Sequence, residues 1–102
     1  MHILMIFLDG IGLGDNNPSV NPFAVANMPV LTGLTNQRRW LNDIGRQSSS
    51  RAIFIPTDAS MGIPGRPQSA TGQAAILTGR NIPRLIGEHY GPKPNPPVRK
   101  LL

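Results

Sequence analysis

Apolar residues concentrate in two short runs that predict β-strands. Residues 2–8 are almost wholly apolar, without alternation, and stop at Asp9, while residues 51–55 form a shorter run that stops at Pro56. Continuous apolar runs of this length are typical of strands that are covered on both faces in a parallel sheet. We therefore expect two buried strands, at 2–8 and at 51–55.

A helix is predicted after each of the two strands. A helix of about three turns is expected within 30–44, where apolar residues recur at helical spacing, less regularly toward the end: Val30, Leu31, Leu34, Trp40, Leu41 and Ile44. Residues 69–78 predict a second helix, for which Gly79 suits the C-terminal cap. A third helix is expected to start at Pro97, because proline favours the first helical turn. Loops are expected at 16–28, 57–67 and 87–97.

The order strand, helix, strand, helix predicts the α/β class. We expect the β-α-β-α opening segment of a doubly wound, mainly parallel sheet. Two short strands joined by loops of more than about ten residues make a poor independent domain. Residues 1–102 are therefore interpreted as the N-terminal segment of a single, incomplete α/β domain.

The amino-acid composition and the charge exclude several classes of protein and of partner. The 102 residues include no cysteine, which excludes disulfide scaffolds, zinc fingers and thiol nucleophiles and suits the reducing cytoplasm. The apolar run at 2–8 is too short for a secretion signal or a membrane span. Ten Lys and Arg against five Asp and Glu give a net charge of +5, which favours an anionic partner. The arginines are scattered and not interleaved with aromatic residues, so we expect neither nucleic acid nor membrane among the partners.

Asp9 follows the first predicted strand directly and precedes Gly10. The C-terminal edge of a parallel strand is where open α/β sheets place their ligands. A phosphate would be repelled by this carboxylate unless a cation stood between them, which points to a metal ligand. Aspartate also caps turns, and the position alone leaves the two roles equally open.

Ser69 and Thr71 stand in the first turn of the helix expected at 69–78. Unpaired N–H groups and the positive end of the helix dipole favour an anion there. A serine in that place attacks phosphorus when a coordinated divalent metal lowers the pKa of its hydroxyl. Serine at a helix start is more often an N-cap, so both roles stay open. Arg66 and Arg80 flank the segment and are candidates for phosphate contacts or, more commonly, solvated surface charges.

Histidine is scarce, with only His2 and His89 in the chain. Their positions lack the spacing of a zinc site, so no complete metal centre can be assembled from them. We expect His89, in the loop predicted at 87–97, to lie at the surface.

Several segments together carry a family resemblance. The most specific is 67–73, Pro-Gln-Ser-Ala-Thr-Gly-Gln, which continues to Leu77-Thr78-Gly79-Arg80. The others are Phe7-Leu8-Asp9-Gly10-Ile11-Gly12, Asn21-Pro22-Phe23, Pro29-Val30-Leu31, Asp58-Ala59-Ser60-Met61-Gly62, His89-Tyr90-Gly91 and Pro97-Val98-Arg99-Lys100-Leu101-Leu102. Over nearly its whole length the chain resembles the N-terminal part of the alkaline phosphatase superfamily of metalloenzymes, near the branch of cofactor-independent phosphoglycerate mutase.

The resemblance implies a fold, a cofactor and a mechanism. It implies an alkaline phosphatase-like α/β domain with two divalent metal ions, Mn²⁺ or Zn²⁺, with Mg²⁺ as an alternative. Asp9 would be a metal ligand, and Ser69 would be the metal-contacting nucleophile that is transiently phosphorylated. Thr71 is the second candidate nucleophile, because other branches use threonine. The partner implied is a phosphorylated small-molecule substrate.

The family supplies further Asp and His ligands from the C-terminal half of a longer chain, and these are not identifiable here. We therefore expect the N-terminal part of a metal-dependent phosphatase or phosphomutase, inactive by itself. Its remaining partner would be the missing C-terminal part of the domain or a separate chain. The alternative hypothesis is a small non-catalytic module that binds an anion or a protein, in which Asp9 and Ser69 only cap turns.

Overall fold

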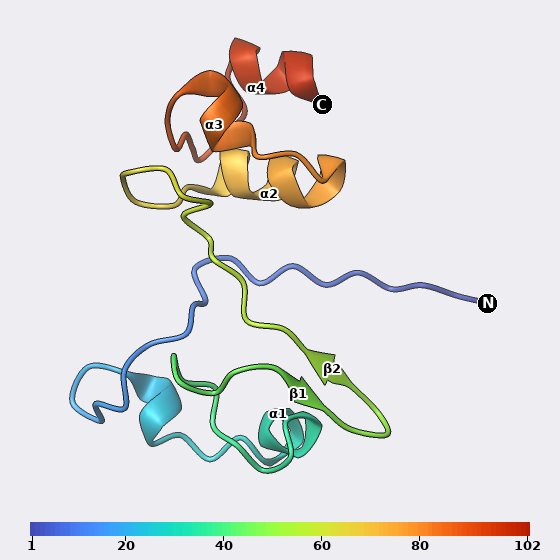
Figure 1. Cartoon of the computed structure of the whole chain (residues 1–102), viewed down its shortest axis with the longest axis vertical. Coiled ribbons are helices and arrows are strands. Elements are labelled where there is room, and N and C mark those ends of the chain that lie inside the picture. The colour runs from blue at the N-terminus through green and yellow to red at the C-terminus, as the bar shows by residue number, and fades with distance from the viewer. The chain divides into compact units, whose positions relative to one another are not determined.

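The computed structural model describes residues 1–102 as two units, which we call the N-terminal unit (Met1–Thr57) and the C-terminal unit (Asp58–Leu102). The N-terminal unit contains η1, α1, β1 and β2 in that order, and the C-terminal unit contains α2, α3 and α4 (Figure 1). No helix in either unit combines the length and the apolar character needed to cross a membrane.

A short 3-10 helix, η1, interrupts the loop that the sequence predicts at 16–28. It spans Pro22–Ala24, and the side chain of Asn21 accepts a hydrogen bond from the Phe23 amide at 3.1 Å. Proline fixes the backbone angle that a first helical residue needs, and asparagine is among the preferred N-caps. The sequence of this loop therefore contains its own helix start.

The first α-helix, α1, covers only Pro29–Leu34. It ends because Asn36 and Gln37 both adopt left-handed backbone, with φ of 53° and 65°, and the Arg38 amide donates to the Thr35 carbonyl at 3.0 Å. Two left-handed residues closed by such a bond form a tight turn that reverses the chain. The helix of three turns expected within 30–44 is therefore wrong beyond Leu34.

Trp40 organises the core of the N-terminal unit from the irregular segment after this turn rather than from a helix. Its ring stacks on Phe23, with centroids 6.3 Å apart, and packs at a tilt against Phe54 at 5.1 Å. Its Nε1–H donates to the hydroxyl of Thr35, which is fully buried, at 3.2 Å. Leu41 and Ile44 are buried nearby in sequence. The apolar positions expected on one helix thus do reach a core, by a different backbone path.

Two short strands form an antiparallel hairpin. β1 is Gln47–Ser48 and β2 is Ile53–Phe54, with Gln47 opposite Phe54 and Ser48 opposite Ile53. The strand expected at 51–55 is therefore shorter, and it is not buried throughout, since Ile53 is 62% exposed. The sheet contains no third strand, so a doubly wound parallel sheet stays a prediction about a larger domain.

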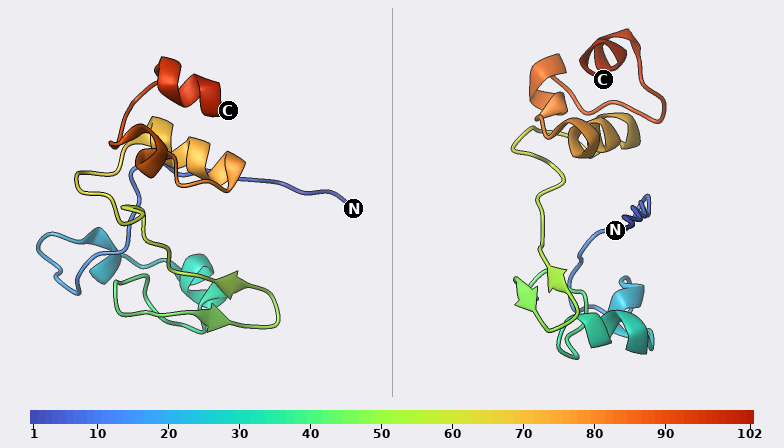
Figure 2. Two further views of the ribbon diagram at one scale, coloured as in Figure 1. Left: turned by 45° about the horizontal axis from the view of Figure 1, so that its top comes forward. Right: turned by 90° about the vertical axis from the view of Figure 1, so that its right-hand side faces the viewer.

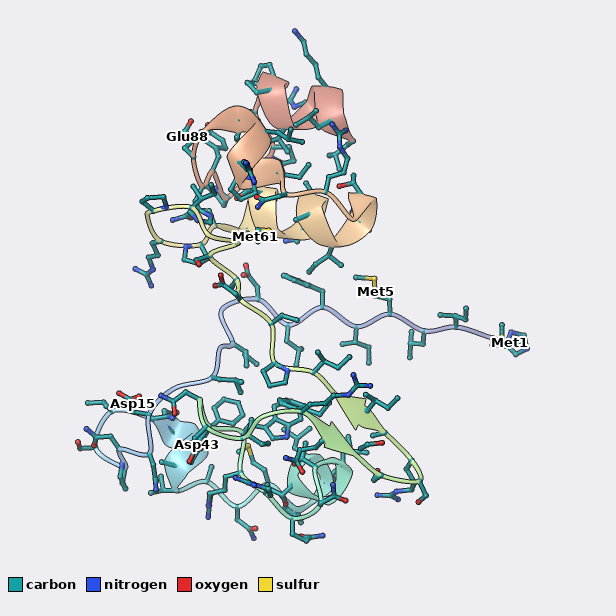
Figure 3. The ribbon with its side chains drawn as sticks, viewed as in Figure 1. Met1, Met5, Asp15, Asp43, Met61 and Glu88 are labelled. Carbon is teal, nitrogen blue, oxygen red and sulfur yellow. The ribbon has the colours of Figure 1, made fainter.

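Residues 1–8 form neither helix nor strand and run extended, with Met1 and Met5 along them in Figure 3. Every side chain from Ile3 to Leu8 is exposed, from 42% at Phe7 to 85% at Ile3. The buried strand expected at 2–8 is therefore wrong for this chain. The reason is physical: a strand needs partners on its edges, and β1 and β2 pair only with each other.

Three helices pack together in the C-terminal unit (Figure 2). They are α2 at Ser69–Thr78, α3 at Ile82–Ile86 and α4 at Pro96–Leu101. The buried residues at their centre are Ala74, Ile82 and Val98, flanked by Ala75, Ile86 and Leu101. One buried apolar residue from each helix therefore holds the three together.

The helix at 69–78 is confirmed with both of its predicted bounds, and Gly79 closes it in left-handed backbone with φ of 67°. The last helix is confirmed too, starting at Pro96 instead of Pro97. The helix α3 was not expected. Its start is fixed by Asn81, whose side chain accepts from the Arg84 amide at 3.1 Å, and its end by Gly87 at φ of 88°.

Candidate functional site

Ser69 is the first residue of α2, and the residue at the N-cap position is Gln68. The Gln68 backbone is extended (φ −129°, ψ 149°), and its side chain makes no capping hydrogen bond. Ser69 itself is half-buried. The sequence correctly predicts that this serine lies at a helix start. Ser69 is not the N-cap, which is the common structural role of a serine there, but the residue after it.

Ser69 lies on the face of α2 opposite its buried residues. At helical spacing it shares this face with Gly72, Gln73 and Ile76, and Ile76 is 55% exposed. The buried residues of the helix lie on its other side: Ala70, Thr71 and Ala74. The candidate nucleophile is therefore on the side of the helix that faces away from the buried residues.

Thr71 is fully buried, and its polar groups are used within the C-terminal unit. Its amide donates to the Tyr90 carbonyl at 3.0 Å, and its hydroxyl oxygen accepts from the Tyr90 amide at 3.2 Å. The hydroxyl proton points to the carbonyl of Gln68 at 3.2 Å or that of Tyr90 at 3.3 Å. Thr71 therefore has a structural role. Its amide is not available to bind an anion, although the sequence analysis expects the amides of this turn to be.

Gly91 approaches the start of α2 closely. A Cβ at this position would lie 3.1 Å from the Ser69 amide nitrogen, 3.1 Å from the Gln68 Cβ and 3.2 Å from the Gln68 Oε1. Such distances are tighter than ordinary van der Waals contacts, and one of them is to backbone. The bare α-carbon of Gly91 thus allows the loop after α3 to lie against Ser69.

The loop before α2 is held by two side chains from later in the sequence. The Asn81 amide Nδ2 donates to the carbonyl of Met61 at 2.8 Å, and the His89 Nε2 lies 3.1 Å from the Ile63 carbonyl. His89 is half-buried and its Nδ1 is buried without a partner, so the surface position expected for it is wrong. An Nε2–H on this ring satisfies the carbonyl of Ile63.

Asp58 closes a tight turn at the beginning of this loop. Its carboxylate accepts the Ser60 amide at 2.9 Å, the Ser60 hydroxyl at 2.6 Å and the Gly62 amide at 3.3 Å. Met61 and Gly62 are both left-handed, with φ of 52° and 72°. Hydrogen bonds to the ionised form, above all from the Ser60 hydroxyl, lower the pKa of Asp58 from its ordinary 3.8.

Asp9 is exposed in the N-terminal unit, in a turn with Gly10, whose φ is 73°. That backbone angle is one that glycine adopts without strain. The turn follows the extended residues 1–8 directly. Asp9 therefore has the exposure that a ligand for an ion needs, and Gly10 is the residue that its turn requires.

The residues of this chain do not by themselves make a metal centre. No three His, Cys, Asp or Glu side chains gather closely enough to hold an ion. Carboxylate and alkoxide oxygens suit Mn²⁺, Mg²⁺ and Zn²⁺, but divalent ions usually take several ligands each. Asp9 and Ser69, which belong to different units, supply only two donors.

Positive charge is concentrated in the C-terminal unit. It contains six Lys and Arg but only two acidic residues, Asp58 and Glu88. All six basic side chains are exposed: Arg66, Arg80, Arg84, Lys93, Arg99 and Lys100. An anionic ligand at the start of α2 would therefore approach a unit of favourable charge.

Comparison of the chain with protein-family models, with curated proteins and with solved structures finds no match.

Proposed function

We propose that the chain is the N-terminal, nucleophile-bearing part of a divalent-metal-dependent phosphatase or phosphomutase that forms a phosphoserine at Ser69. One observation carries the proposal: Ser69 begins α2 on the side opposite the buried residues of the helix and is half-buried, whereas Thr71 is fully buried. The resemblance of 67–73 to the alkaline phosphatase superfamily supports the same serine. The two hydroxyls of this helical turn thus take different roles.

The reaction has two displacements at phosphorus. In the first, the Ser69 Oγ forms a bond to the phosphorus of a phosphate ester, the P–O bond to the alcohol breaks, and the alcohol leaves with the serine proton. In the second, the oxygen of water or of a second hydroxyl forms a bond to the phosphorus of the phosphoserine, the P–O bond to Ser69 breaks, and the proton of the acceptor passes to the Ser69 Oγ. Water as acceptor gives a phosphatase, and a substrate hydroxyl gives a mutase.

The start of α2 suits the charge that develops in these steps. The positive end of the helix dipole stabilises negative charge near the first turn, and the exposed basic side chains of the C-terminal unit add a favourable field. Arg66 comes three residues before Ser69 and is exposed, so it is the first candidate for a direct phosphate contact. The substrate class is accordingly a phosphorylated small molecule.

The proposal assigns Asp9 one ligand position for the divalent ions, which we take to be Mn²⁺ or Zn²⁺, with Mg²⁺ as the alternative. When bound, such ions polarise the phosphoryl oxygens and lower the pKa of an alcohol. The other ligands, and the strands that would flank residues 2–8, would come from the rest of the domain or from a separate chain. The absence of cysteine favours the cytoplasm as its compartment.

The test compares the whole gene product that contains these 102 residues with the 102-residue chain. The whole product, supplied with Mn²⁺ or Zn²⁺, should hydrolyse p-nitrophenyl phosphate or transfer its phosphoryl group, and the short chain should not. Ser69→Ala should abolish turnover with metal content retained, while Asp9→Asn should lower metal content. Ser50→Ala, at an exposed turn serine, is the matched control. Full turnover by Ser69→Ala would refute the proposal.

A further inference from the structure

We infer that residues 89–91 act as a positioning segment for Ser69, with Gly91 as its decisive residue. The inference deepens the proposed function and, in its catalytic part, rests on it. Three separate contacts connect this segment to the chain before and at the start of α2, and each of the three residues makes one of them.

The first contact fixes the loop before the helix. The His89 Nε2 meets the Ile63 carbonyl at 3.1 Å, six residues before Ser69. The His89 ring also lies next to Gly65, since a Cβ there would be 3.6 Å from the His89 Cδ2. His89 therefore supports the path by which the chain enters α2.

The second contact fixes the first turn of the helix. Thr71 and Tyr90 exchange two hydrogen bonds, from the Thr71 amide to the Tyr90 carbonyl (3.0 Å) and from the Tyr90 amide to the Thr71 hydroxyl (3.2 Å). Because Thr71 is fully buried, solvent does not compete for these bonds. The Tyr90 backbone therefore has one position relative to the turn that contains Ser69.

The third contact follows from the second. With Tyr90 held at Thr71, the α-carbon of Gly91 lies so near Ser69 that a Cβ would be 3.1 Å from its amide nitrogen. The φ of Gly91 is outside the left-handed region, unlike those of Gly79 and Gly87. A side chain at 91 is therefore opposed by lack of space and not by backbone angle, because a Cβ there needs the Ser69 amide, Gln68 or the loop to move by a few tenths of an ångström.

Displacement of Ser69 matters because a nucleophile acts from a defined position. A shift of about 1 Å in a reacting group can lower a rate about a hundredfold. Gly91 lies against the Ser69 amide and acts through Ser69, so we describe it as a positioning residue. Gly72 is the matched control, because a Cβ there meets nothing within 4 Å and its φ is ordinary.

The structural arm of the test uses ¹⁵N,¹³C-labelled 102-residue chain and NMR. Gly91→Ala should shift the amide and Cβ signals of Ser69, and Gly72→Ala should leave the Ser69 Cβ signal near its wild-type value. Unshifted Ser69 signals in Gly91→Ala would overturn the inference. Recovery of the wild-type Ser69 signals in the double variant Gly91→Ala, Gln68→Gly would also overturn the inference. The clash would then be with the Gln68 side chain alone.

A second pair of variants covers the case in which Gly91→Ala fails to fold. Thr71→Val removes the hydroxyl that accepts the Tyr90 amide, and Thr71→Ser keeps it. Thr71→Val should shift the Ser69 signals, and Thr71→Ser should leave them near their wild-type values. Equal Ser69 signals in the two variants would overturn the inference.

The catalytic arm uses the whole gene product, well below its melting temperature. Gly91→Ala requires a shift of only a few tenths of an ångström, so it should lower kcat for p-nitrophenyl phosphate about threefold to tenfold with KM changed less than about twofold, whereas Gly72→Ala should retain kcat. If Gly91 had a purely structural role, Gly91→Ala would lower the melting temperature and leave kcat unchanged. That result would overturn this inference but not the proposed function. Absence of phosphoserine in the wild-type product would overturn the proposed function, and with it the catalytic role of Gly91.

Discussion

Thr71 and Tyr90, nineteen residues apart, hold each other through reciprocal hydrogen bonds of 3.0 and 3.2 Å. This pairing uses the hydroxyl of Thr71, which is fully buried, two residues after the half-buried Ser69. The sequence alone presents the hydroxyls of Ser69 and Thr71 as alternative nucleophiles, and the fold gives the Thr71 hydroxyl a structural role. The choice between them comes from packing, and it favours Ser69.

The core of the C-terminal unit should depend on Ile82. This side chain is fully buried between α2 and α4, where it contacts Ala74 and Val98. Ile82→Ala should lower the free energy of unfolding by about 2–5 kcal/mol, because it removes apolar contacts and leaves a cavity. Leu85→Ala, at a side chain 52% exposed in the same helix, should change it by less than about 0.5 kcal/mol. Urea denaturation of the two variants measures the difference, and equal losses would contradict the core described here.

The turn at Asp58 should make stability depend on acid pH. The folded pKa lies below the ordinary 3.8, so the turn's contribution is fully present above that value. It is lost as the pH falls through the lower, folded pKa, when the carboxylate is protonated. The Ser60 hydroxyl is the largest cause of the shift, so Ser60→Ala should raise the Asp58 pKa toward 3.8.

NMR titration of the Asp58 side chain measures this pKa in the wild type and in Ser60→Ala. Ser50→Ala serves as the control, because Ser50 lies in the hairpin turn away from Asp58 in sequence. An Asp58 that titrates at 3.8 or above in the wild-type chain would contradict the hydrogen bonds of this turn.

Residues 3–8 should drive self-association of the 102-residue chain. Six consecutive exposed apolar residues without charge, proline or glycine form a template for intermolecular strand pairing. Leu4→Lys should reduce association, because a charge on an unpaired strand opposes edge-to-edge pairing. Val20→Lys, at a loop residue 75% exposed, should not. Sedimentation velocity across a concentration series compares them, and an equal effect of both lysines would contradict the role of residues 3–8.

Local signals predicted two of the three helices of the C-terminal unit, α2 and α4. α2 follows from its alanine-rich, apolar composition and its Gly79 cap from the backbone freedom of glycine, and α4 follows from its prolines. α3 was missed although Asn81, Pro83 and Gly87 mark its start and end, because five residues are too few for a periodic pattern. Short helices are therefore better predicted from caps than from periodicity.

The N-terminal unit was predicted less well because tertiary contacts decide its backbone. The spacing of Trp40, Leu41 and Ile44 suggested one long helix, but the turn at Asn36 and Gln37 brings these side chains to the core by another path. A run such as 2–8 has strand composition, yet composition does not supply the neighbouring strand. These outcomes depend on partners distant in sequence.

The candidate site was predicted only in part. Ser69 at a helix start follows from local sequence, but the support it receives from Tyr90 and Gly91 does not. That support is carried mostly by backbone groups nineteen or more residues away, and backbone hydrogen bonds leave little trace in residue type. Gly91 itself was a weak signal, because this glycine serves close packing rather than the backbone angle of a turn.

The most direct test of the account is the detection of phosphoserine at Ser69. The whole gene product is incubated with Mn²⁺ and a phosphate ester, quenched in acid and mapped by peptide mass spectrometry. We expect phosphate on Ser69, none on Thr71, and none at all in Ser69→Ala. Turnover accompanied by phosphate on Thr71, or by no phosphorylated residue in 67–73, would contradict it.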